Sequence, residues 1–491
     1  MRVSTNSLYL NNLSNMMSKQ TSLNKIQEQL SSMRRVNSPS DDPVAAAQIL
    51  DQTQADNRIQ QFNQNAKSAE SALALTETSL QTAGDILQLV RQIAVKAGNT
   101  ALTNDDRKML NSELEGLYKQ LLGTANTFDG NGKALFGGSI SQTKPFSELA
   151  QFGTTVAAGS SIVQYNGDDN RQEMLISSSR QVPVTENGSY AFERIPEGNG
   201  VFKLGAGSTL SNVQVDLGSV IDRAAFDASP LATNGNKIEV VFSSQDDGVD
   251  GSAADFSQYY DILSYDAATL TYTSLVTGST ATAVSSAPAD LLAAASLTSP
   301  LYYNSANPNP AAAFGPGLRS QSEQVDIGNP LKYPKFKSGS DVDLTAYGYG
   351  IKFAISSEKP AAGGVITVEQ SKTHSIFDTL NDFSRVLQSD VATPADATDF
   401  ANRLGNVIAN IDNTQTRMLS VEARIGANRN EADALVEVGA DFALQYKAIL
   451  SRLQDVDVAS ASIELSLAKL ALDASQNSFA KVQGLSLFNY I

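Results

Sequence analysis

Apolar residues repeat with a helical period near the start of the chain. Between residues 55 and 94 an apolar position recurs every three or four residues, with Thr76 as the polar exception. A repeat held over roughly five heptads predicts a long helix whose apolar seam packs against another helix. Asp41 and Asp42 suit the N-cap and Pro43 the first turn, whereas Gly98 suits the carboxyl end. We therefore expect one helix over residues 43–97.

A longer repeat of the same kind lies near the other end of the chain. It starts after Thr393-Pro394 and keeps one apolar frame from Phe400 to Ala474. Polar residues or glycine interrupt the frame only at Thr414, Asn428, Gly439 and Ser460. This pattern predicts a helical region that stays in register over the whole of that span.

Two shorter helices are predicted beside the long ones. Thr103 or Asn104 can cap a helix that carries a leucine seam between residues 110 and 121. Ser375 and Asp378 stand in capping-box spacing before an apolar repeat at Ile376, Leu380, Phe383 and Leu387. The first 35 residues carry a weaker, basic seam. A thin amphipathic helix of this kind is marginal alone, so both chain ends must find partners.

The middle of the chain changes its period. Between about 139 and 371, short alternating or β-branched runs are separated by turns rich in Gly, Asn and Asp, which predicts antiparallel β structure in two small subdomains. The runs are 161–167, 181–188, 237–244, 268–276 and 364–370. Residues 267–318 are rich in Ala, Ser, Thr and Pro, and Asp290 is their one charge. This stretch is expected to be a surface insertion or a partly disordered segment.

These patterns together predict a multidomain α+β protein. A rod of long helices, in a coiled coil or bundle, is built from both chain ends, and a central antiparallel β-rich region is inserted in it. We expect three parts: a terminal helical assembly segment (1–40 with 440–491), a helical rod (41–138 with 375–439) and a variable β-rich region (139–374).

The composition of the chain limits its possible functions more than its possible folds. The 491 residues carry a net charge of −16, which argues against a nucleic-acid partner. The chain has no cysteine and a single histidine, His374, so neither a disulfide framework nor a thiolate metal site can form. The start of the chain lacks the apolar core of a Sec signal peptide, and no run of 18 apolar residues predicts a membrane span. These signals alone would place the protein in the cytoplasm.

Sequence motifs for catalysis are missing from the chain. It contains no H-E-x-x-H, G-x-S-x-G, P-loop or G-x-G-x-x-G sequence. His374 lies beside a predicted helix cap, where a satisfied or surface role is expected. We therefore predict no enzymatic activity, no cofactor and no metal. The heptad seams favour either a bundle core within one chain or contacts with neighbouring subunits.

Several segments resemble the flagellin family. MRRVNSPSDDPVAAAQ at 33–48, the helical stretch at 62–136 and SVEARIGANRNEADAL at 420–435 are similar to its amino- and carboxyl-terminal regions. PSDDP, the closing LSLFNYI at 485–491 and the segment at 163–193 resemble its hook-associated members in particular. Residues of about 200–360 exceed what a short member needs and resemble nothing familiar.

The resemblance implies a structural role in the bacterial flagellum, at the junction of hook and filament. It implies export through the flagellar type III channel without a Sec signal, an extracellular location, and terminal helices that fold on assembly. The implied partners are its own subunits in a ring or helical layer, the other hook-associated junction protein, flagellin and a cytoplasmic export chaperone, with no nucleic acid and no membrane. Assembly and chaperone contacts are expected at Leu13, Leu23, Ile26, Leu30, Ile449, Leu453, Ile463, Leu467 and Leu470. The alternatives are a filament flagellin, or an adhesin-like binding function in the β-rich insert.

Overall fold

The structure is a computed structural model of the 491-residue chain. It describes residues 5–140, 142–157, 160–206, 213–233, 235–246, 256–276, 280–282, 334–356, 360 and 364–484. The long helices are α1 (Thr5–Ser32), α2 (Pro43–Ala97), α3 (Asn104–Ala125), α7 (Ile376–Gln388), α8 (Pro394–Gln454) and α9 (Val458–Gly484). Helix α2 begins and ends where its sequence pattern predicts.

The chain divides into two compact units. Unit one comprises residues 1–71, 173–182 and 429–491, and unit two comprises residues 72–172 and 183–428. Helices α2 and α8 each contribute one part to each unit. The three-part division predicted from the sequence stays a prediction.

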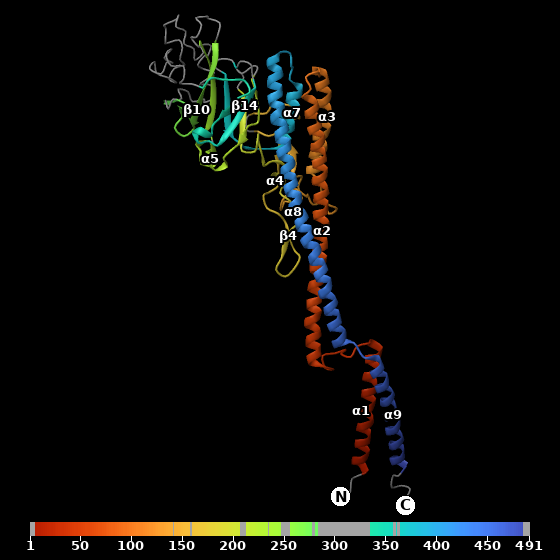
Figure 1. Cartoon of the computed structure of the whole chain (residues 1–491). Coiled ribbons are helices and arrows are strands. Elements are labelled where there is room, and N and C mark those ends of the chain that lie inside the picture. Colours follow the sequence, from red (N-terminus) through yellow and green to blue (C-terminus); the bar gives the residue numbers. More distant parts are fainter. Residues whose placement is uncertain are drawn as a thin grey trace, which may run out of the picture. The chain divides into compact units, whose positions relative to one another are not determined.

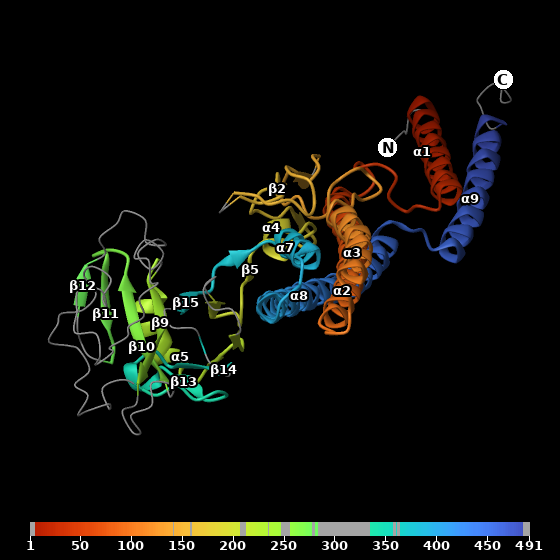
Figure 2. The same cartoon turned by 90° about the horizontal axis from the view of Figure 1, so that it is seen from above.

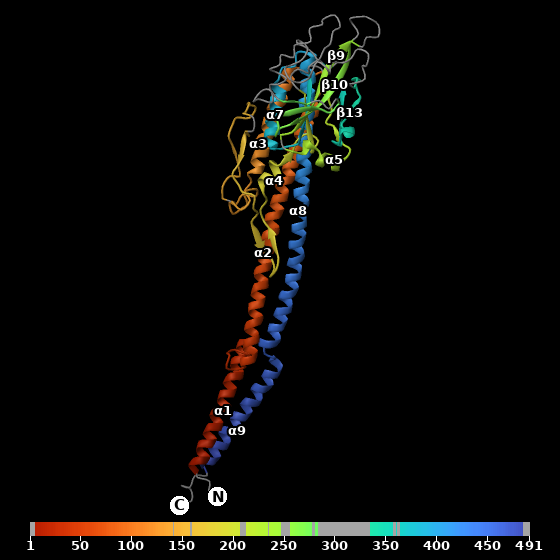
Figure 3. The ribbon, with the colours of Figure 1, turned by 90° about the vertical axis from the view of Figure 1, so that its left-hand side faces the viewer.

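Unit one is almost entirely helical. Helix α1 packs along α9, and the two lie side by side in Figures 1 and 3. The first part of α2 and the last part of α8 form the rest of the unit, together with a hairpin of β3 (Glu173–Leu175) and β4 (Gln181–Pro183). The hairpin is fastened to α8 by an ion pair of Arg180 with Glu431, and to α2 by a 2.8 Å hydrogen bond from the Asn65 side chain to the Leu175 carbonyl.

The helices of unit two begin at well-defined caps. Thr103, one of the two N-caps that the sequence offers, caps α3 in a full capping box with Asp106. Ser375 caps α7 by accepting a hydrogen bond from the Phe377 amide. Asp378, expected to complete a capping box there, instead accepts a 2.9 Å hydrogen bond from the amide of Ile162, so that part of the prediction is wrong. Helix α3 packs along α7 (Figures 1 and 3).

Between α3 and α7, aromatic rings build a core over the short strands β1 (Phe146–Glu148) and β2 (Val163–Tyr165). The Phe377 ring of α7 is fully buried. Its centroid lies 5.3 Å from the centroid of the Phe146 ring and 6.1 Å from that of Phe192 in α4 (Gly188–Phe192). The Phe377 and Tyr118 rings are nearly perpendicular, with their centroids 6.3 Å apart. Aromatic pairs at these separations are favourable beyond the area that they bury.

A β-rich part follows within unit two, entered through β5 (Ile195–Pro196) and left through β16 (Thr373–His374). Its main sheet has the strand order β12-β11-β10-β9-β15-β6, with all neighbours antiparallel (Figure 2). A second sheet has the order β13-β14-β7, and β8 also pairs with β14. The strands of these sheets and the α-helix beside them are β6 (Phe202–Ala206), β7 (Gln214–Val215), β8 (Ser219–Val220), α5 (Arg223–Ala228), β9 (Lys237–Asp246), β10 (Phe256–Asp266), β11 (Thr271–Ser274), β12 (Thr280–Thr282), β13 (Asp341–Asp343), β14 (Ile351–Ser356) and β15 (Val365–Gln370).

Alternation along these strands creates the core of the β-rich part. Ile238, Val240 and Phe242 of β9 are buried with Ile366 and Val368 of β15 on one face. Residues of β14 join the same cluster. All five runs predicted as strands contain a strand, so the antiparallel β-rich middle is confirmed. Most of the low-charge stretch at 267–318 lies outside the described residues.

Helix α8 departs from the sequence expectation at its carboxyl end. It ends at Gln454, and α9 begins at Val458, so the predicted frame does not run through one continuous helix. Asp457 causes the new start, because its carboxylate accepts hydrogen bonds from the amides of Ala459 and Ser460 at 3.0 and 3.4 Å. The break changes which face of the following helix packs.

Candidate functional site

Helix α9 has two apolar faces, and only one is covered. Ala461 and Leu472 are buried, and Leu465, Ala468 and Phe479 are half-buried in the same heptad frame, which identifies the side that packs on α1. A second row stands on the other side of the helix, and we call it the outer stripe. It consists of Ile463, Leu467, Leu470 and Ala474. Ile463, Leu467 and Leu470 are 63%, 59% and 65% exposed.

The outer stripe is the continuation of the frame predicted from the sequence. Helix α8 ends before the residues of the outer stripe are reached. In α9 these residues therefore face away from α1 and stay exposed, although they continue the apolar repeat of α8. Exposed apolar rows of this kind mark interaction surfaces. The corresponding outer face of α1 is weaker, with Leu10 and Met17 exposed among polar residues.

The other residues expected to make assembly contacts lie on partly covered surfaces. Leu13, Leu23, Ile26 and Leu30 of α1 are half-buried, as are Ile449 and Leu453 of α8. Leu23, Ile26 and Leu30 repeat at helical spacing along α1, which packs on α9. The structure thus separates the nine predicted residues into an exposed set of three and a half-buried set of six. Their roles as contacts stay a prediction.

In unit one, the connection between α1 and α2 contacts the end of α8 and the short connection between α8 and α9. The Arg35 amide donates to the Gln454 carbonyl at 2.6 Å, and the Arg35 guanidinium donates to the Leu453 carbonyl at 2.9 Å. The Val456 amide donates in turn to the Met33 carbonyl at 3.1 Å. The last carbonyls of a helix lack partners within the helix, so the α1–α2 connection caps the end of α8. Sequence reasoning missed this role of Arg35, because the two partners are more than 400 positions apart.

Asp41 and Asp42 order the α1–α2 connection. Asp41 accepts from the Ser38 amide at 2.9 Å and pairs with Lys25 at 3.0 Å, whereas Asp42 accepts from the Ala45 amide at 3.0 Å at the start of α2. The hydrogen bond from Lys25, followed by that from the Ser38 backbone, lowers the pKa of Asp41 from 3.8 to about 2. The pKa of Asp42 is lowered chiefly by the hydrogen bond from the Ala45 backbone. The helix-starting role predicted for this acidic pair is therefore seen in Asp42.

Acid should loosen this connection within a defined pH window. A carboxyl whose pKa is lower in the folded chain stabilises the fold above its unfolded pKa, and this stabilisation is lost as the pH falls towards the folded pKa. For Asp41 the window runs from 3.8 down to about 2. We expect the hydrogen-exchange protection of residues 33–42, corrected for the intrinsic exchange rate, to fall between pH 5 and pH 2. Asp41→Asn should show the lower protection already at pH 5, and unchanged wild-type protection across this range would refute the assignment.

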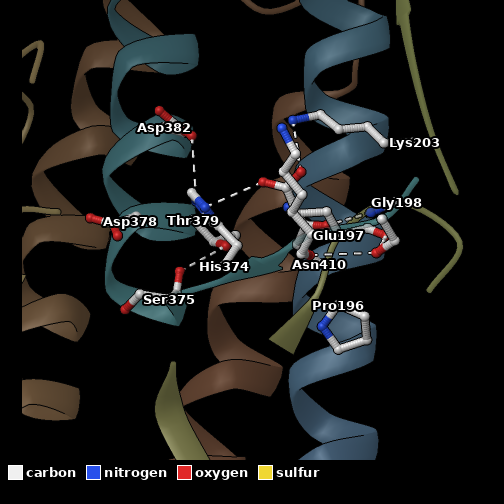
Figure 4. Close-up of polar contacts among 12 residues, drawn as sticks. Pro196, Glu197, Gly198, Lys203, His374, Ser375, Asp378, Thr379, Asp382 and Asn410 are labelled. Carbon is white, nitrogen blue, oxygen red and sulfur yellow. Dashed lines mark hydrogen bonds and ion pairs between the residues drawn. The ribbon is translucent and has the colours of Figure 1, made fainter. Parts of the chain in front are cut away.

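His374 lies where the chain returns from the β-rich part to the helices (Figure 4). Its Nδ1 is 3.3 Å from Glu197 Oε1 and its Nε2 is 3.7 Å from Asp382 Oδ2. Glu197 also binds Lys203 at 3.0 Å, and Asp382 binds Arg385 at 3.3 Å. The imidazole therefore joins two already paired carboxylates, which agrees with the structural role expected for it.

The described part of the chain contains no group of three or more His, Cys, Asp or Glu side chains arranged to hold a metal ion. Within the same residues, no helix is both long enough and apolar enough to cross a membrane.

The chain is similar to proteins of the bacterial flagellum. Residues 3–141 match the family model of the bacterial flagellin N-terminal helical region. The chain is 32% identical over 195 residues to flagellar hook-associated protein 3 of Salmonella typhimurium, covering 40% of this chain and 58% of the relative. It is 34% identical over 221 residues to the protein of the same name in Escherichia coli, covering 45% of this chain and 66% of the relative. The chain thus spans less than two thirds of either relative.

A solved structure shares the fold over most of the chain. The crystal structure of flagellar hook-associated protein-3 from Legionella pneumophila matches with a TM-score of 0.60, at 24% identity, and covers 82% of this chain and 98% of that one. At this identity the likeness concerns the fold alone. All three of these relatives are flagellar hook-associated proteins by name, and such proteins form a structural family and not an enzyme family. The match over residues 3–141 and the similarity to the two hook-associated proteins confirm the resemblance of the chain to the flagellin family.

Proposed function

We propose that the chain is a structural, non-enzymatic protein of the bacterial flagellum that joins the hook to the flagellin filament. It contacts the other hook-associated junction protein on the hook side and flagellin on the filament side, and its own copies form a ring or helical layer. The names of the two hook-associated relatives support the location.

The outer stripe of α9 is the observation that carries the assembly role. A chain that worked alone would gain nothing from three aliphatic side chains that are each about 60% exposed on one helix face. Covering them with a neighbour removes apolar surface from water at roughly 25 cal/mol per Å². Ile463, Leu467 and Leu470 are therefore proposed as contacts to neighbouring subunits in the assembly and to a cytoplasmic chaperone before export.

The remaining proposed contacts support the pairing of the two terminal helices. Leu23, Ile26 and Leu30 keep α1 on α9, and Ile449 and Leu453 lie just before the α8–α9 break. Leu13 lies on the half-covered surface of α1. The ends are proposed to become fully ordered only in the extracellular assembly, after export through the flagellar channel without a Sec signal.

Deletion of the gene tests the junction role. We expect complete hooks without filaments and flagellin monomers released into the medium, as seen by electron microscopy and by immunoblotting of the culture supernatant. Expression of the full chain from a plasmid should restore the filaments. Normal filaments in the deletion strain would reject the junction role, and hooks that carry short or fragile filaments would favour a filament flagellin.

A further inference from the structure

A groove of about 320 Å³ lies in unit one between α2 and α8, and the turn of the β3–β4 hairpin lines part of it. Its walls are mainly apolar. They include Ile59 and Phe62 of α2, Ile176 of the hairpin, and Val438, Phe442 and Tyr446 of α8. Val438 is 47% exposed and Phe442 is 44% exposed.

This groove is an uncovered length of the α2–α8 seam. In unit two the seam residues of these helices are fully covered: Leu80, Leu87 and Val90 of α2, and Val421 and Ile425 of α8, have no exposed surface. In unit one the corresponding Ile59, Phe62 and Leu435 stay half-buried. Two helices alone cannot cover a seam this wide, so the groove has the form of a helical bundle that lacks a member.

The outer stripe of α9 has the spacing that this groove needs. The groove side of α8 presents Leu435, Gly439, Phe442 and Tyr446, at positions i, i+4, i+7 and i+11. The stripe presents Ile463, Leu467, Leu470 and Ala474 at the same intervals. Each surface is thus about 16 Å long at ~1.5 Å per residue. Equal spacing lets the side chains of one helix enter the gaps of the other.

Charges on the two surfaces are complementary. Arg58 is exposed on the α2 wall and has no ion-pair partner among the described residues. Glu464 and Asp473 are exposed on the two flanks of the stripe, and within the described chain they too lack an ion pair. Whichever way the docked helix runs, one of these two acidic side chains lies on the flank beside Arg58, although such exposed pairs add little affinity.

We propose that α9 of a second copy of this chain lies in the α2–α8 groove as the third helix of the bundle. The proposal rests on the proposed function, since it specifies which surfaces of neighbouring subunits meet. In one copy the groove and the outer stripe are both exposed, so they do not cover each other. The opposite face of α9 packs on α1. The stripe is therefore free to enter the groove of another copy. A contact between two different surfaces repeats head to tail, which generates a ring or a helical layer instead of a closed pair.

Cysteine cross-linking tests the contact directly, because the natural chain has no cysteine. Phe442→Cys and Leu467→Cys are expressed as two full-length chains with different tags in a strain that lacks the wild-type gene. Flagella are sheared, oxidised and analysed by non-reducing gel. We expect a disulfide-linked dimer that carries both tags, at least fivefold above the pair Glu437→Cys with Lys469→Cys, whose positions are exposed away from the groove and the stripe.

The outcomes separate this contact from the junction role. Filaments attached to hooks, with no mixed dimer above the control, would overturn the groove assignment and leave the junction role standing. A Leu467→Cys chain that links only to itself would overturn it in favour of a contact between two α9 helices. As a second measurement, Arg58→Glu should lower the cross-link yield, and Glu464→Arg with Asp473→Arg in the partner chain should restore it. Failure of this rescue, with normal attachment of filaments, would also count against the groove.

Discussion

Replacing Ile463, Leu467 and Leu470 together with serine is expected to abolish attachment of filaments to hooks while the secreted chain stays folded. Each side chain is at least 59% exposed, so the isolated chain loses little packing. Because about 60% of each side chain is exposed in the single chain, covering it in the assembly contributes about 1–2 kcal/mol. Three losses per subunit therefore weaken the contact by several orders of magnitude. Electron microscopy of hooks gives the main readout.

The matched control places the same number of changes on another exposed face of α9. Ser462, Lys469 and Gln476 are exposed and lie seven residues apart, away from both apolar faces. Alanine at these three positions should leave filaments attached. Circular dichroism of both purified variants should match that of the wild type. Filaments attached normally in the triple serine variant would reject the outer stripe as an assembly surface.

The helical part of the fold was largely predictable because its signals are local. Helix α2 has its capping carboxylate, its first-turn proline and its closing glycine within or beside the helix, and both ends agree with the structure. The break between α8 and α9 was missed, because the apolar frame continues through it and only Asp457 marks the new start. A periodic pattern shows which residues share a face. It does not show what covers that face.

The sequence predicts which residues form the outer stripe of α9, but not that they are exposed. Ile463, Leu467 and Leu470 follow from the repeat, but their exposure follows from the break and from α1 occupying the other face of α9. Arg35 and the α2–α8 groove depend on pairings between distant segments. The order of the central sheet likewise depends on distant pairings, with β15 inserted between β9 and β6.

Phe377→Ala is expected to cause the largest loss of stability in unit two. The ring is fully buried, and it contacts aromatic rings from α3, β1 and α4. Removing a buried phenylalanine costs about 3–5 kcal/mol, because apolar contacts are lost and the rigid surroundings do not close the cavity. Here the neighbours come from different elements, and each is held by contacts of its own. We therefore expect a cost at the upper end of that range.

Urea unfolding followed by circular dichroism and tyrosine fluorescence measures this cost. Leu149→Ala is the control, because Leu149 is 63% exposed beside the same core and should change the free energy of unfolding by about 0.5 kcal/mol or less. Phe377→Leu keeps most of the apolar volume and should recover more than half of the loss. A Phe377→Ala variant as stable as the control would mean that the aromatic core does not hold α7 against α3.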